Sequence, residues 1–327
     1  GESVSFASLN RNKRSLAVNL KHPDGLAIVK KLAETADVVL ENNRPGAMEK
    51  LGLGADQLKL VNPKLIYVSI SGFGQTGPAR QRGGLNVIAE AASGVMSIYG
   101  EPDKMPMRPA IQTADLFAGM YAAYAVLAGL VGAARNGEGR TADVALTEAV
   151  LAAETWEASG FLATGEVPQR VGHRHRLNAP NQLFETKDGR YIAIASPNDA
   201  LFVKMLEILG LGDYADDPRF ATYSLRKVNE DALIALVEEA ILRRSGAELE
   251  EEFSGAGVPA GLVKDMKEAL DDPQMVERQM VVTVDHPTFG PLKMLRSPVV
   301  MDHDGPAISR PPPLLAQHTT EILRELG

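Results

Sequence analysis

Hydrophobic positions in the first 80 residues follow two different periods. Residues 14–20, 37–42 and 64–74 are short apolar runs, the last of them rich in β-branched side chains, as is typical of strands. Between them, residues 22–36 repeat apolar side chains at helical spacing, and residues 44–60 are helical in pieces. This strand–helix order predicts an α/β protein with a Rossmann-like parallel sheet and right-handed crossovers.

Further along the chain the pattern changes. Residues 84–96 and 113–134 are predicted helices, and residues 183–196 form two short apolar runs around a Lys-Asp-Gly turn, which indicates a hairpin. A helical stretch at 229–254 and a short C-terminal helix follow. We therefore expect a large domain over residues 1–160, a linker at 161–182, a smaller α+β domain at 183–226, and a linker helix with a C-terminal return at 227–327.

The segment from Leu116 to Ala134 holds nineteen residues without a charge. As a helix it reaches about 28 Å, close to the roughly 30 Å hydrocarbon core of a bilayer. Its many Ala and Gly residues lower its apolarity, and spanning helices favour Leu, Ile, Phe and Val. We interpret it as a buried core helix of a soluble protein.

Asp115 lies at the start of this helix and allows two interpretations. Thr113 and Asp115 are both suited to capping the helix N-terminus. Alternatively, a carboxylate at this position is partly desolvated yet held ionised by the helix dipole, which suits a nucleophile or a base. The residues alone leave both roles open.

Composition narrows the function classes. The chain has no cysteine, which excludes disulfides, thiolate zinc sites and cysteine nucleophiles. A net charge of −8 argues against a general nucleic-acid binder, since phosphate contacts need a basic face. With a mean hydropathy of −0.09 and no visible targeting signal, we expect a cytoplasmic protein that does not bind membranes.

Two other motifs carry little chemistry. Gly72, Gly74 and Gly77 form a G-x-G-x-x-G pattern after a predicted strand, but Pro78 follows at once where a dinucleotide site needs a helix. We expect a Gly-rich turn there and no redox cofactor. His173 and His175 have no third ligand nearby in the sequence, so we expect no metal site.

The exit of the predicted strand at 37–42 is polar. Ligands in open parallel sheets bind at the carboxyl ends of strands, so this segment is placed for an anionic or nucleotide-like group. An ordinary Asn-rich strand exit fits equally well. The residues concerned are Asn42, Asn43, Arg44, Gly46 and Lys50.

The order of six motifs resembles the family III CoA-transferases, the CaiB/BaiF family. These motifs are LNRNKRSLAVNL, ADVVLENNRPGAMEKLGLG, YVSISGFGQTGP, TADLFAGMYAAYAVLAGL, GVPAGLVKDMKEALDDPQ and RPPPLLAQHTTEIL. The resemblance implies that Asp115 forms the covalent intermediate, that CoA is bound as a substrate, and that an interlocked homodimer forms. It implies CoA contacts at Val18, Leu20, Lys21, Asn42, Asn43, Arg44, Gly46, Ala47, Lys50 and Leu51.

The resemblance further implies a reaction between an acyl-CoA and a small carboxylic acid through aspartyl anhydride and aspartyl-CoA intermediates, without a metal or redox cofactor. Three departures are visible. The family's first strand–turn–helix has no counterpart before "GESVSFASLN", so the chain looks N-terminally incomplete. The Gly-rich loop of the formyl-CoA transferase branch is missing, which makes oxalate–formate chemistry less expected. The proton-relaying His of the racemase branch is replaced by the stretch Gly84-Leu85-Asn86, which favours transfer.

Two alternative functions stay open at this point. One is isomerase chemistry of the 2-methylacyl-CoA racemase type. The other is a CoA-binding paralogue without catalytic activity.

Overall fold

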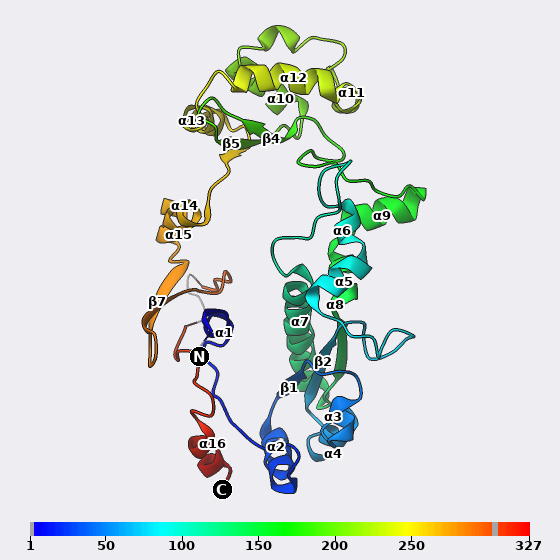
Figure 1. Ribbon diagram of the computed structural model, residues 1–327, viewed down its shortest axis with the longest axis vertical. Helices are drawn as coiled ribbons and strands as arrows, with labels where there is room; N and C mark the ends of the chain where they lie inside the picture. Colours follow the sequence, from blue (N-terminus) through cyan, green and yellow to red (C-terminus); the bar gives the residue numbers. More distant parts are fainter. Residues whose placement is uncertain (1–2, 303–306) are drawn as a thin grey trace. The chain divides into compact units, whose positions relative to one another are not determined.

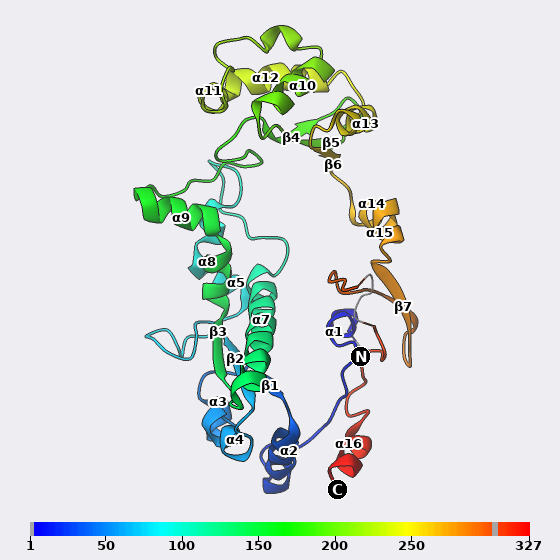
Figure 2. The same ribbon diagram turned by 180° about the vertical axis from the view of Figure 1, so that it is seen from behind.

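The computed structural model describes residues 3–302 and 307–327 and forms two units (Figures 1 and 2). Unit 1 contains the chain up to Val95, Pro109–Thr164 and the chain from Glu268 onward. Unit 2 contains Met96–Arg108 and Gly165–Lys267. The domain boundaries expected from the sequence stay a prediction.

A parallel three-stranded sheet forms the centre of unit 1. Its strands are β1 (Val38–Glu41), β2 (Ile66–Ser71) and β3 (Thr141–Ala145), in the order β1-β2-β3. Val38 pairs with Ile66 and Tyr67 pairs with Thr141, both in parallel register. β2 is buried along its whole length, as expected for the central strand of a sheet covered on both faces. The prediction of a mixed α/β fold with a parallel sheet is therefore confirmed.

The strand predicted at 14–20 is wrong. These residues are extended but join no sheet, and they run beside the start of α16 (Thr319–Leu326). The Ala17 amide donates to Thr319 Oγ1 at 3.1 Å, and the His318 amide donates to the Ser15 carbonyl at 3.0 Å. Residues 14–20 have the composition of a strand, but their backbone groups bond to this distant segment and not to a neighbouring strand.

Helices surround the unit 1 sheet, and an antiparallel hairpin precedes the C-terminal segment. The structure confirms the helix predicted at 113–134 and the short C-terminal helix, whereas the helix predicted at 84–96 is two helices because Gly94, in a left-handed conformation, ends the first. The elements of unit 1 besides those already given are α1 (Val4–Leu9), α2 (Pro23–Thr35), α3 (Ala47–Lys50), α4 (Ala55–Val61), α5 (Asn86–Ser93), α7 (Thr113–Asn136), α8 (Leu146–Ala153), α9 (Thr155–Thr164), α15 (Pro273–Glu277), β7 (Val281–His286) and β8 (Gly290–Leu295). Two short helices, α6 (Val95–Ile98) and α14 (Met266–Asp271), cross the boundaries between the units.

α7 is only partly the buried core helix that the sequence suggested. Its face of small residues packs against β2, β3, α5 and α8, and its buried residues are Ala114, Ala118, Ala122 and Gly129. Its larger apolar side chains are exposed on the single chain: Leu116, Met120, Tyr124, Leu127 and Val131. Because the helix is apolar all round, its pattern cannot indicate which face packs. Among the described helices, α7 alone is long and apolar enough to cross a membrane.

Unit 2 is built around an antiparallel sheet of β4 (Asn181–Glu185), β5 (Tyr191–Ala195) and β6 (Ala260–Leu262). The predicted hairpin is confirmed, with β4 and β5 joined by the turn at Gly189. The helical stretch at 229–254 is two helices, because Ser245 caps a new one. The helical elements are α10 (Asp199–Ile208), η1 (Gly212–Tyr214), α11 (Tyr223–Val228), α12 (Glu230–Ile241) and α13 (Gly246–Ala256).

Candidate active site

Asp115 is the third residue of α7, and it does not cap the helix. The N-cap residue is Gln112, whose side chain makes no capping hydrogen bond. Within the described part of the chain, the Asp115 carboxylate takes part in no hydrogen bond. Neither Thr113 nor Asp115 therefore has the capping role that the sequence left open for it.

The capping of α7 comes instead from α5. The first three amides of a helix have no acceptor within the helix. Here the amides of Ala114 and Asp115 donate to Asn86 Oδ1, at 3.0 and 3.2 Å. The Thr113 amide donates to Glu90 Oε1 at 3.1 Å. With all three donors occupied by α5, the Asp115 carboxylate is left available for chemistry.

The surroundings of Asp115 raise the pKa of its carboxyl group above the ordinary value. Partial burial is the larger cause, because it disfavours the charged form, and the nearby Glu90 carboxylate adds repulsion. A carboxylate with a raised pKa is more basic, which suits a nucleophile. Despite this partial burial of its carboxyl group, the residue as a whole is exposed on the single chain, so a substrate can reach it.

Topology places Asp115 and the polar exit of β1 at the same edge of the sheet, the edge at which the parallel strands end. α7 leads directly into β3, so it runs against the direction of the parallel strands. Its first residue therefore lies toward the carboxyl ends of β1–β3. The segment directly after β1 lies at this same edge and contains Asn42, Asn43 and Arg44. Ligands of open α/β sheets bind there.

The residues implied in CoA binding lie on two segments. Asn42, Asn43 and Arg44 are exposed after β1, and the Asn43 amide donates to Glu41 Oε2 at 2.7 Å. Gly46 precedes α3 with a φ of 86°, a left-handed conformation that favours glycine. Ala47 and Lys50 are the first and last residues of α3.

The structure brings some of these residues together. Leu20 and Leu51 pack in the same hydrophobic cluster, around the buried Leu53 and Tyr67. Val18 is half-buried and Lys21 is exposed in the extended segment before α2. Within the described residues, no hydrogen bond links any of this set to Asp115.

The Gly-rich loop after β2 lacks the strand–turn–helix arrangement of a dinucleotide fingerprint. No helix begins until α5, and the loop closes on itself where Gly72 meets Gly84. A Cβ added at Gly72 would lie 2.5 Å from the Gly84 Cα, so neither position accepts a side chain. These two glycines are explained by a backbone crossing and not by a phosphate.

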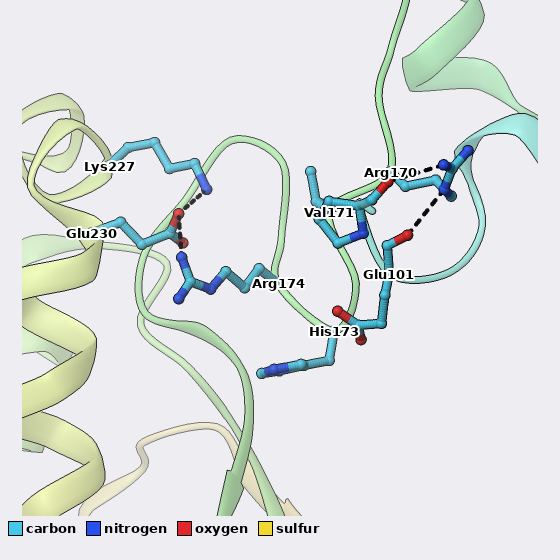
Figure 3. Close-up of a pocket in the computed structure, with 8 residues that line it drawn as sticks. Glu101, Arg170, Val171, His173, Arg174, Lys227 and Glu230 are labelled. Atoms are coloured by element: carbon cyan, nitrogen blue, oxygen red, sulfur yellow. Dashed lines mark hydrogen bonds and ion pairs between the residues drawn. The ribbon is translucent and has the colours of Figure 1, made fainter. Parts of the chain in front are cut away.

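A cavity of about 390 Å³ lies within unit 2 (Figure 3). At its wall the Glu230 carboxylate lies between Lys227 Nζ, at 2.6 Å, and the Arg174 guanidinium, at 3.7 Å. Arg170 donates to the backbone carbonyls of residues 97, 101, 102 and 104. These cations hold segments of the protein together, so the cavity offers no free charge for a ligand from them. Among the residues that the structure describes, no group of three or more His, Cys, Asp or Glu side chains could hold a metal.

Sequence reasoning missed Asn86 and Glu90 as neighbours of Asp115. A signal was present, because α5 is Ala-rich yet carries polar residues at positions 86, 90 and 93, which lie on one helical face. All three are buried. A polar stripe on a helix that is otherwise apolar indicates a polar partner on the facing element.

Comparison with known proteins identifies the family of this chain. The model of CoA-transferase family III matches residues 1–319. Human succinyl-CoA:glutarate CoA-transferase is 37% identical over 325 residues, which cover 99% of this chain and 74% of that protein. Succinate–glutarate CoA-transferase of Agrobacterium fabrum is 36% identical, over 100% of this chain and 82% of that one. The crystal structure of a CaiB/BaiF family protein from Brucella suis superposes with a TM-score of 0.86 at 36% identity, covering 100% and 85% of the two chains. The chain therefore belongs to the family III CoA-transferases, the CaiB/BaiF family.

Proposed function

We propose that this enzyme moves CoA between an acyl-CoA thioester and a carboxylic acid, with Asp115 as the nucleophile. The observation that carries the proposal is the free Asp115 carboxylate at the start of α7, whose neighbouring amides are already bonded to α5. The raised pKa of Asp115 supports the same role.

The proposed reaction has two symmetrical halves. Asp115 attacks the thioester carbonyl, the C–S bond breaks, and CoA thiolate leaves a mixed aspartyl–acyl anhydride. The thiolate then attacks the aspartyl carbonyl, which releases the donor acid and forms an aspartyl-CoA thioester. The acceptor carboxylate repeats these steps in reverse and restores Asp115. Binding both reactants beside Asp115 supplies the high effective concentration that a weak nucleophile needs.

The chemistry proposed here needs no metal and no redox group. CoA is expected along the polar exit of β1, α3 and the extended segment with Val18, Leu20 and Lys21. The relatives named for succinyl-CoA and glutarate support a small dicarboxylic acid as acceptor and its CoA ester as donor.

We also propose that the enzyme is a homodimer. A second copy is the expected partner of the exposed apolar face of α7, which consists of Leu116, Met120, Tyr124, Leu127 and Val131. An apolar strip of this length is uncommon on a monomer's surface and marks an interface.

Replacing Asp115 by Asn tests the proposal. Donor–acceptor pairs such as succinyl-CoA with glutarate are incubated with the enzyme, and the products are followed by mass spectrometry. Asp115→Asn should abolish transfer while leaving folding intact, because an amide cannot form the anhydride. Asp56→Asn is the matched control, since Asp56 also lies in the first turn of a helix and is exposed. Transfer that survives in Asp115→Asn, or α-proton exchange in D₂O without transfer, would contradict the proposal.

A further inference from the structure

The polar face of α5 holds a buried carboxyl group, Glu90, that forms no ion pair with any residue the structure describes. The Glu90 side chain is 0% exposed. Its Oε1 accepts from the Thr113 amide at 3.1 Å and from the Thr113 hydroxyl at 2.7 Å. Its Oε2 and the Nδ2 of Asn86 are buried without a hydrogen-bond partner in the described part of the chain.

Buried polar groups without partners weaken a protein fold, so their presence at this position calls for a functional reason. Burying a carboxyl group with one unsatisfied oxygen costs stability, and an apolar side chain of similar size would avoid that cost. A Ser, Thr or Asp at the N-cap position would also have capped α7 locally. The chain has Gln112 there instead and draws the cap from α5, 23 to 29 residues away in the sequence.

We propose that Glu90 and Asn86 are positioning residues for Asp115, which hold the first turn of α7 from outside and so keep the nucleophilic carboxylate free and directed away from its own backbone. This inference rests on the proposed function, since it assumes that Asp115 is the nucleophile. Each residue has a separate task. Asn86 holds the amides of residues 114 and 115, and Glu90 holds residue 113 and adds a negative charge near Asp115.

The charge of Glu90 has an electrostatic consequence. The elements packed against α7 carry three other titratable residues, namely Tyr67 on β2, Asp143 on β3 and Glu148 on α8. Among charged neighbours, Glu90 is the one that raises the pKa of Asp115, in addition to burial. Removing that charge should therefore lower the pKa of Asp115 and make it a weaker base.

The test measures the first chemical step at different pH values. Enzyme in excess is mixed with succinyl-CoA, quenched, and the fraction modified at Asp115 is measured by mass spectrometry. Glu90→Gln keeps the shape and an acceptor oxygen but removes the charge. The acid limb of its rate profile should move to lower pH, and the plateau rate should fall about tenfold, with little change in the enzyme concentration at half-saturation.

Variants of Asn86 give a second test, in which the acid limb of the pH–rate profile is expected to move in the opposite direction. Asn86→Asp keeps the acceptor oxygen for the amides of residues 114 and 115 but adds a charge, so its acid limb should move to higher pH. Asn86→Ala removes the acceptor, and its plateau rate should fall about 10- to 100-fold, since small misplacements of a reacting group cost that much. Glu148→Gln on α8 is the control and should leave the profile unchanged.

The possible outcomes distinguish a failure of the positioning roles from a failure of the proposed function. Wild-type enzyme that is never modified at Asp115 would overturn the proposed function. Modification of wild type at Asp115, combined with profiles of Glu90→Gln and Asn86→Asp that match the wild type, would overturn the positioning roles alone. If Glu90→Gln proves unfolded by circular dichroism, the shift in Asn86→Asp decides: a higher pH for its acid limb supports the inference, and an unchanged limb contradicts it.

Discussion

At the scale of single residues, the role of Asp115 depends on contacts that local sequence does not contain. Its place at the start of an apolar helix could be predicted from the pattern around it. Whether Asp115 caps the helix could not, because the side chains that cap it, Glu90 and Asn86, lie 25 and 29 residues before Asp115. Capping from a second helix is a tertiary interaction, and only the fold brings it together.

Glu154 provides a residue-scale prediction that is independent of catalysis. Burial raises the pKa of Glu154 to about 7, the Ser93 hydroxyl opposes this by a hydrogen bond, and Glu157 adds repulsion. Between pH 4.5 and pH 7 the folded protein holds a proton that the unfolded chain has released. The stability associated with this proton is present below pH 4.5 and is lost as the pH rises through 7.

Replacing Glu154 by Gln removes this titration. In urea unfolding, the free energy of unfolding should fall less steeply from pH 4.5 to 8 in Glu154→Gln than in wild type. The free energy of unfolding of Glu154→Gln minus that of wild type should increase by about 1 kcal/mol between pH 4.5 and pH 8, after allowance for solvent screening. Glu157→Gln is a suitable control, with a smaller effect in the same direction. Parallel pH profiles for wild type and Glu154→Gln would show that Glu154 titrates normally.

At the scale of elements, α7 shows what a hydrophobic pattern can and cannot predict. The helix was predictable from its length and its uninterrupted apolar run. Its buried face was not, because small and large apolar residues alternate around it without a polar side. The run at 14–20 was misread for a related reason. β-Branched and apolar residues indicate an extended chain, but a strand also needs a neighbour to pair with, and these residues pair with the segment at 318–319.

The close packing of α7 on β2 gives a prediction for its glycines. A Cβ added at Gly129 would lie 2.8 Å from the Ile66 Cγ2, and Ile66 is buried and stiff at χ1. Gly129→Ala should therefore lower the free energy of unfolding by about 1–3 kcal/mol through overpacking. Gly132→Ala on the same helix meets no atom within 4 Å and should be neutral or stabilising by up to about 1 kcal/mol. Equal stabilities of the two variants in urea titrations would argue against this contact.

At the scale of the whole molecule, the motif order predicts the family, and the family model and relatives bear this out. Motifs that specify this family extend along the entire chain, so the family is recognisable from one sequence. The identity of the acceptor acid, unlike the family, cannot be predicted from the order of motifs. It depends on a few side chains that line a pocket and on their distances, which no pattern along the chain encodes.

The proposed homodimer is tested by a charge placed on the exposed face of α7. Tyr124 is 72% exposed, and Tyr124→Glu would bury a carboxylate in an interface between two copies. Wild type should sediment as a dimer at micromolar concentration, and Tyr124→Glu should shift strongly toward the monomer. Leu60→Glu is the control, because Leu60 is 84% exposed on α4 and lies outside this face. A wild type that sediments as a monomer would contradict the dimer.

Chemical trapping of the covalent intermediate tests the central claim most directly. Wild-type enzyme is incubated with succinyl-CoA and then with hydroxylamine, which converts an aspartyl-CoA thioester or aspartyl anhydride into a hydroxamate, and the modified residue is located by peptide mass spectrometry. We predict a hydroxamate at Asp115 alone, with none in Asp115→Asn and full labelling in Asp56→Asn. An unmodified Asp115 in enzyme that demonstrably transfers CoA would contradict the account.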